Sequence, residues 1–195
     1  MGRNRKIPDR WLDYYPMKEA LYDARIIPIK CPLPRSRFLD EAMYQYRWTP
    51  DDVMRTIPNL GLVIDITNKQ PAYYDPNEFI HNGIDFVKIP CVGHHVPDDR
   101  VFLRLCDVIN TFLMQNSRNN RIIALHCTHG INRTGYLICR YLIEHLRYSP
   151  QRALHTFALK RGYSIERENY IEDLHKLLPV TENTLGPPSW ISQRR

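Results

Sequence analysis

The sequence predicts an α/β fold with a central, mainly parallel, twisted sheet flanked by helices. Short apolar runs rich in β-branched residues at 61–67, 84–90 and 121–126 predict strands, because such runs suit strands better than helices. Helical patterns separate the three runs, and this alternation is typical of a parallel sheet. Ligands of such sheets bind at the carboxyl ends of the strands, so the residues that follow the third run are of interest.

Capping residues mark the predicted helices. Thr49 before Pro50 predicts an N-cap followed by proline at the first helical position. Asp75 and Glu78 have the spacing of a capping box at the start of a short helix that Gly83 ends. Four longer helices are predicted at about 98–116, 133–147, 149–162 and 166–178.

Composition narrows the class of protein. The chain has 195 residues, 43% of them apolar and 25% charged, which is typical of a globular domain. Its net charge of +6 suits a polyanionic partner such as RNA, DNA, a phosphorylated protein or an anionic membrane surface, although solubility alone also explains it. No apolar stretch reaches the length of a membrane span, and no signal peptide is seen at the N-terminus.

The five cysteines predict neither a disulfide framework nor a structural zinc site, because their number is odd and no CxxC pair occurs. Free thiols indicate a reducing compartment, so we expect the protein in the cytoplasm, the nucleus or both.

The segment from His126 to Thr134 carries the chemistry. Its pattern, HCxxxxxRT, follows an apolar strand and precedes a helix. The amides of such a loop and of the helix N-terminus converge on one point, a geometry that binds a phosphate dianion. Cys127 lies at the first position of the loop, where the positive field favours the thiolate and lowers the pKa of the thiol. The sequence therefore predicts a nucleophile that attacks phosphorus.

Neighbouring residues receive supporting roles in this prediction. The planar fork of Arg133 suits two phosphate oxygens at once, so we expect it to stabilise the transition state. Thr134 donates to the thiolate and assists the hydrolytic step, and His126 orients the loop rather than acting as a base. The predicted phosphate-binding loop comprises Thr128, His129, Gly130, Ile131, Asn132 and Arg133.

The motif resembles the signature of the protein-tyrosine and dual-specificity phosphatase superfamily. Further resemblance lies in 61–67, 92–99, 126–141 and 166–174, which look like the RNA 5′-phosphatase subfamily. That subfamily comprises the animal phosphatase that interacts with RNA and ribonucleoprotein, the baculovirus RNA phosphatase and the triphosphatase domain of mRNA capping enzymes. The resemblance implies a cysteine-phosphatase fold, no metal cofactor and release of phosphates from RNA 5′ ends. It also implies a catalytic role for Asp65, as a residue that holds Arg133 or orders the loop.

Three segments are expected. Residues 1–45 are predicted to form an arm that packs on the domain, 46–179 the phosphatase catalytic domain, and 180–195 a flexible basic tail. We expect a monomer without membrane contact, whose partners are RNA 5′ ends and ribonucleoprotein or small-RNA processing proteins.

A departure from protein phosphatases favours an RNA substrate. Those enzymes carry a general-acid Asp on a loop after a strand, and by alignment Gly93 or His94 stands there. A phenol or alkoxide leaves poorly without a proton, whereas a phosphate end released from an anhydride leaves as an anion. The alternatives are that His94, His95, Asp98 or Asp99 supplies the proton. For the two aspartates, helix capping is the competing role.

Binding of the additional 5′ phosphates and of the RNA backbone requires cationic side chains. The predicted phosphate-binding loop contains no lysine. The candidates from elsewhere in the chain are Arg140, Lys160, Arg161 and Arg167. Aromatic residues within 44–48 could stack a base or pack the arm.

The sequence thus predicts an RNA 5′-tri- and diphosphatase that works through a phosphocysteine and leaves a 5′-monophosphate. The alternatives are a dual-specificity protein phosphatase and an RNA-binding scaffold without activity.

Overall fold

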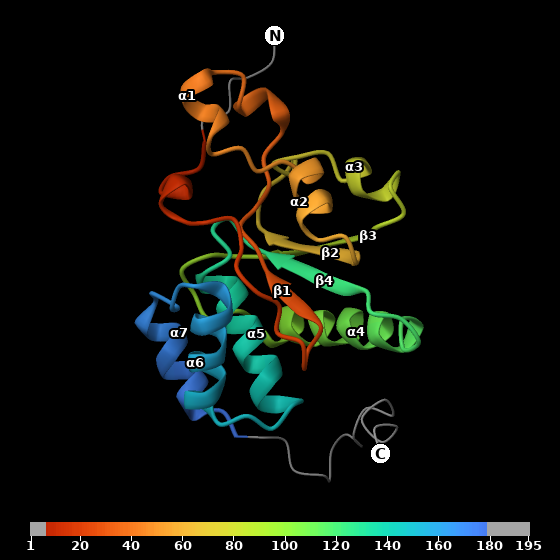
Figure 1. Ribbon diagram of the computed structural model, residues 1–195. Coiled ribbons are helices and arrows are strands. Elements are labelled where there is room, and N and C mark those ends of the chain that lie inside the picture. The colour runs from red at the N-terminus through yellow and green to blue at the C-terminus, as the bar shows by residue number, and fades with distance from the viewer. Residues whose placement is uncertain (1–6, 179–195) are drawn as a thin grey trace.

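The computed structural model describes residues 7–178 and contains a four-stranded parallel sheet (Figure 1). The strands are β1 (Ile26–Pro28), β2 (Leu60–Thr67), β3 (Asp85–Cys91) and β4 (Ile122–His126), and they lie in the order β1-β4-β2-β3. Helices cover both faces of this sheet. The predicted α/β class with a parallel sheet is therefore confirmed.

The strand register brings three polar residues together at one edge of the sheet. Asp65 in β2 pairs with His126 in β4 on one side and with Lys88 in β3 on the other. All three lie at or near the carboxyl ends of their strands, where the loop after β4 begins. The register therefore places these three polar residues side by side beneath that loop.

One face of the sheet is covered by the four longest helices of the described chain (Figure 1). These helices are α4 (Asp99–Gln115), α5 (Asn132–Glu144), α6 (Pro150–Arg161) and α7 (Glu168–Lys176). The boundaries of α4 and α6 agree with the predicted ranges, whereas α5 ends at Glu144, before the predicted end, and α7 begins at Glu168, after the predicted start. Asp98 accepts a bond from the Arg100 amide, Ser149 caps α6, and Gly162 ends it with φ 84°. Apolar side chains of these helices form a core against the strands.

The opposite face is covered by short elements and by the N-terminal segment (Figure 1). These elements are η1 (Trp11–Asp13), η2 (Arg35–Arg37), α1 (Glu41–Tyr44), α2 (Pro50–Thr56) and α3 (Asn77–Ile80). A capping box between Thr49 and Asp52 starts α2, so the predicted start of this helix is confirmed. Trp11, Trp48 and Phe79 are buried in the second core that these elements form.

The sequence analysis did not predict strand β1. It is three residues long, and no periodic pattern extends beyond Ile26–Pro28. It pairs with β4 at the edge of the sheet, where a proline is tolerated. The division of the chain at residue 45 stays a prediction, and the segment before it supplies one strand of the sheet.

The predicted helix at α3 is present, and its capping box is present in part, because the Glu78 carboxyl bonds the Asp75 backbone while Asp75 bonds the amide of Asn77 instead of that of Glu78. Asp75 accepts a bond from the amide of Asn77 at 3.0 Å, and Pro76 occupies the N-cap without a side-chain bond. Gly83 follows the helix with φ 71°, as its predicted role requires. Among residues 7–178, no helix is long and apolar enough to cross a membrane.

Candidate active site

The loop between β4 and α5 forms a cradle around one sulfur atom. Strand β4 ends at His126, α5 begins at Asn132, and Cys127 lies between them with 3% of its surface exposed. Ile131 at the N-cap offers no capping side chain, so it leaves the first amides of α5 unoccupied by a cap. Free amides at a helix N-terminus favour a bound anion, as predicted for this segment.

The surroundings of Cys127 favour its thiolate. Burial by itself would raise the pKa of the thiol, but the Arg133 guanidinium, the Thr134 hydroxyl and the Thr134 and Gly130 amides outweigh it. The pKa of Cys127 therefore lies below the usual value of a cysteine. The Thr134 hydroxyl oxygen also accepts a bond from the Cys127 amide at 2.8 Å, which fixes the hydroxyl beside the sulfur.

Arg133 is held from behind by carbonyl oxygens. Its Nη1 donates to the backbone oxygen of Cys91 at 2.7 Å and more weakly to that of Ile66 at 3.4 Å. Its Nη2 lies 3.3 Å from the Thr128 hydroxyl in the loop. These bonds orient the guanidinium toward the loop, so it is placed to bind phosphate oxygens.

Asp65 does not hold Arg133, one of the two roles considered for it. Its buried carboxylate accepts bonds from Lys88 at 2.7 Å and from the Thr67 amide at 2.7 Å. Burial would raise the pKa of this carboxyl, yet the nearby His126 ring together with these donors keeps it lowered. Lys88 also donates to the Thr67 hydroxyl at 2.6 Å. The sequence analysis missed Lys88, although a lysine inside an apolar strand was a visible signal.

His126 is bonded to the first residue of the loop and to a side chain outside it. Its Nδ1 lies 3.1 Å from the Cys127 carbonyl oxygen, and its Nε2 lies 2.7 Å from the Tyr74 hydroxyl. Burial lowers the pKa of this imidazole despite the Asp65 carboxylate 3.8 Å from Nδ1, which favours the neutral ring. In the neutral ring Nδ1 donates to the carbonyl and Nε2 accepts from Tyr74. Nothing in the sequence indicated that Tyr74 would be its partner.

Arg161 is not a surface contact for RNA, which corrects the prediction made for it. The side chain is fully buried behind the loop. Its Nε donates to the Gly130 oxygen at 3.2 Å, and its Nη2 donates to the oxygens of His129 at 3.0 Å and Tyr15 at 2.8 Å. The guanidinium therefore binds the outward-facing carbonyls of the phosphate loop.

Two polar side chains of the loop turn away from its centre. Asn132 accepts bonds from the amides of Glu166 at 2.9 Å and Arg167 at 3.1 Å, which ties the loop to the start of α7. His129 bonds through Nε2 to the Asp9 carbonyl at 2.7 Å. Any phosphate contact from these two residues therefore uses the backbone.

The other cations predicted to contact RNA differ in whether their charge is available to a ligand. Arg140 pairs with Asp99 at 2.7 Å and Glu144 at 2.7 Å, and Lys160 pairs with Glu19 at 2.6 Å, so all these charges are neutralised locally. Arg167 is half-buried, and within the described chain its side chain has no ion-pair partner. Its backbone is bonded to the loop, which makes it the best placed of the four.

The loop after β3 lies beside Arg133, and the residue at position 93 of this loop is a glycine. A Cβ atom added to Gly93 would lie 3.9 Å from Arg133 Nε. Of the proton donors considered above, Asp98 caps α4 and Asp99 pairs with Arg140. His94 and His95 are exposed to solvent.

A lowered-pKa cysteine in an amide cradle, with an arginine fork at its side, defines a cysteine-dependent phosphatase. The five cysteines are all free, as predicted. Within the part of the chain that the structure describes, no group of three or more His, Cys, Asp or Glu side chains is placed to hold a metal ion.

The chain belongs to the dual specificity phosphatase family. The family model "Dual specificity phosphatase, catalytic domain" matches residues 44–177. Among curated relatives, the RNA/RNP complex-1-interacting phosphatase of Bos taurus is 42% identical over 91% of this chain and 54% of its own length. The chain thus spans about half the length of that relative. The tyrosine-protein phosphatase of Autographa californica nuclear polyhedrosis virus is 35% identical over 86% of this chain and 98% of its own.

Solved structures agree on the fold. The active form of Tk-PTP aligns over 84% of this chain and 99% of its own, with a TM-score of 0.61 and 16% identity. At this identity the likeness shows the fold alone.

Proposed function

We propose that this phosphatase removes the γ- and β-phosphates from RNA 5′ ends and leaves a 5′-monophosphate. Cys127 attacks the terminal phosphorus in line with the bond to the bridging oxygen, which leaves with the shortened RNA. A phosphocysteine remains, and water then releases inorganic phosphate. Arg133 and the loop amides stabilise the equatorial oxygens in both steps. The other assigned roles, for Thr134, Asp65 and His126, belong to the same proposal.

The observation that carries the choice of substrate is the absence of a carboxylate at Gly93, which stands beside Arg133 in the loop after β3. Asp98 and Asp99, later in the same segment, are bonded within or between helices. A phosphoanhydride tolerates this absence because its leaving group departs as a stable anion. A phosphotyrosine or phosphoserine does not.

Two further observations support the proposal. Relatives over most of this chain bear the name RNA/RNP complex-1-interacting phosphatase, which points to RNA or ribonucleoprotein partners. Arg167, next to the loop and without an ion-pair partner in the described chain, is free to bind an additional phosphate. Metal independence, a monomeric state and a nuclear or cytoplasmic location are parts of the same proposal.

The test uses RNA labelled at the γ- or β-phosphate, incubated with the protein in the presence of EDTA. We expect release of both labels, and no release by Cys127→Ser. An Arg167→Ala variant should raise KM for triphosphorylated RNA while Arg118→Ala, an exposed arginine after α4, should not. Higher kcat/KM on a phosphotyrosyl peptide than on RNA would contradict the proposal and favour a protein phosphatase.

A further inference from the structure

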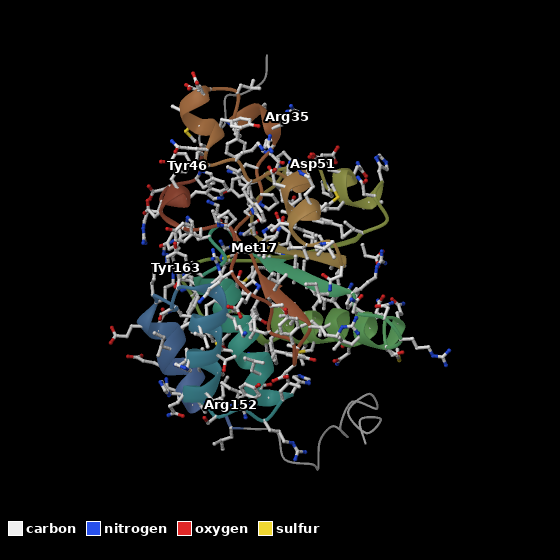
Figure 2. All side chains as sticks on the ribbon, viewed as in Figure 1. Met17, Arg35, Tyr46, Asp51, Arg152 and Tyr163 are labelled. Atoms are coloured by element: carbon white, nitrogen blue, oxygen red, sulfur yellow. The ribbon has the colours of Figure 1, made fainter. Side chains whose placement is uncertain are left out.

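A cavity of about 500 Å³ is lined by residues of the segment before α2 and by Tyr163, which follows α6. Its walls include four tyrosines and two cations, and we call it the tyrosine cavity. These six residues are Tyr14, Tyr15, Tyr46, Tyr163, Lys30 and Arg47. Figure 2 shows Tyr46 and Tyr163 toward the same side of the molecule, one contributed by the segment before α2 and the other by the segment after α6.

The tyrosine cavity shares its wall with the phosphate loop. The Tyr14 ring packs on the ring of His129, a loop residue, with centroids 5.2 Å apart. A Cβ atom added to Gly130 in the loop would lie 3.0 Å from the backbone nitrogen of Lys30. The cavity is therefore separated from the loop by a single layer of residues.

The cavity presents flat aromatic surfaces, and its charged lining residues are the cations Lys30 and Arg47 and the carboxylate Asp13. Tyr15 is 74% exposed and Tyr46 is 41% exposed, so each offers part of a ring face to a ligand. Tyr46 makes no ring contact and no side-chain hydrogen bond with any described residue. Lys30 is 2% exposed, and its ammonium is held by the carbonyl oxygens of Tyr14 at 2.8 Å and Trp11 at 3.3 Å. Arg47 is kept in place by Asp52 at 3.0 Å.

We propose that the tyrosine cavity binds a nucleobase of the RNA strand whose 5′ phosphates occupy the phosphate loop. This inference rests on the proposed function. Bases of any identity stack on tyrosine rings, so the exposed ring faces of the cavity suit a base of the strand. The volume is within the range of small-ligand pockets, so a base with its ribose fits. The site selects nucleic acid over inorganic anhydrides without reading sequence.

The test separates recognition of the base from reaction at the anhydride. The substrates are a short 5′-triphosphorylated RNA and inorganic tripolyphosphate, which has the same anhydride bonds but no base. We expect Tyr15→Leu and Tyr46→Leu each to raise KM for the RNA about tenfold, the loss of one stacking contact. Their kcat/KM on tripolyphosphate should equal that of the unaltered protein.

Two matched variants sharpen the comparison. Tyr46→Phe keeps the ring face and should behave as the unaltered protein. Tyr22→Leu removes a tyrosine that is 72% exposed and does not line the cavity, and it should leave KM for RNA unchanged. An equal effect of Tyr22→Leu and Tyr46→Leu would overturn the proposal.

A binding measurement keeps this inference separate from the proposed function. Fluorescence anisotropy of the labelled RNA with Cys127→Ser, alone and combined with Tyr46→Leu, reports affinity without turnover. A tenfold loss of affinity supports the tyrosine cavity even if the RNA is not hydrolysed, in which case the proposed function fails alone. Equal affinities overturn the cavity proposal, as does a KM effect confined to a phosphotyrosyl peptide.

Discussion

The phosphate loop has two sides of opposite polarity. On its inner side, the amides, the Arg133 guanidinium and the Thr134 hydroxyl surround the Cys127 sulfur. On its outer side, the carbonyl oxygens of His129 and Gly130 accept bonds from the buried Arg161. A peptide group whose N–H points inward must turn its C=O outward, so the two sides form together. In this protein a second cation therefore lies behind the loop, in addition to the one that faces the anion site.

The two arginines differ in their surroundings. Arg133 lies partly open toward the substrate site, whereas Arg161 is fully buried. Burial lowers the pKa of Arg161 to about 10, which still leaves it charged at neutral pH. Its Nη1 has no hydrogen-bond partner among the described residues. The cost of burying this charge is offset because the guanidinium donates hydrogen bonds to three carbonyl oxygens that would otherwise lack a donor.

The largest effect is expected on the inner side. Cys127→Ser replaces a thiolate with a hydroxyl that is not ionised at neutral pH, so kcat should fall by about 10⁴-fold or more. Cys106→Ser, on α4 in the core, is the matched control and should retain activity. Steady-state kinetics on 5′-triphosphorylated RNA measure both. Activity retained in Cys127→Ser would rule out the nucleophile assigned here.

A Gly130→Ala substitution tests how closely the outer side of the phosphate loop is packed against the neighbouring backbone. Its φ is 70°, and a Cβ there would lie 2.1 Å from the Ile29 carbonyl oxygen, so Gly130→Ala must displace the loop. We expect kcat/KM to fall about a hundredfold, as for a misplaced catalytic group. Gly83 has the same backbone conformation, φ 71°, but a Cβ there meets nothing within 4 Å. Gly83→Ala should therefore cost only about 1 kcal/mol of stability and leave activity unchanged.

Arg161→Met removes the cation behind the loop and keeps its bulk. Three carbonyl oxygens lose their donor, so the free energy of unfolding should fall by roughly 2–4 kcal/mol and kcat/KM by about tenfold. The positive charge of Arg161 also favours the thiolate, so the pKa of Cys127 should rise. Arg161→Lys should restore part of that shift. Lys160→Met changes the neighbouring surface cation and serves as the control. An unchanged thiol pKa in Arg161→Met would limit this residue to a packing role.

The smallest expected effect concerns the pH dependence of the reactivity of the Cys127 thiol. The pKa of Cys127 is lowered, so the thiolate persists below the usual pKa of a cysteine and is lost only when pH falls through the lowered value. Alkylation with iodoacetamide, followed by mass spectrometry at each pH, should show Cys127 reacting at neutral pH. Cys106 is the internal reference, because burial raises the pKa of its thiol to about 12. Reaction of both thiols only in strong alkali would contradict the thiolate model.

Local signals predicted most of the fold correctly. The capping residues Thr49, Asp98 and Ser149 and the terminal glycine Gly162 mark helix ends in the structure as they do in the sequence. Strand β1 was missed because three residues at a sheet edge have no pattern of their own, and β4 supplies the partner. The interpretation of Arg161 was wrong because burial depends on packing between α6 and the N-terminal segment.

The sequence by itself determined the strand, loop and helix around Cys127, and it predicted Cys127 as the nucleophile and the arginine six residues later as its partner. This was possible because all the atoms of that unit come from one continuous segment. Only the tertiary structure decided that Lys88 pairs with Asp65, that Tyr74 bonds His126 and that Arg161 lies behind the loop. These partners are 23 to 52 residues apart in the chain, and strand register and helix packing bring them together. No local pattern encodes such contacts, because each depends on the position of several elements at once.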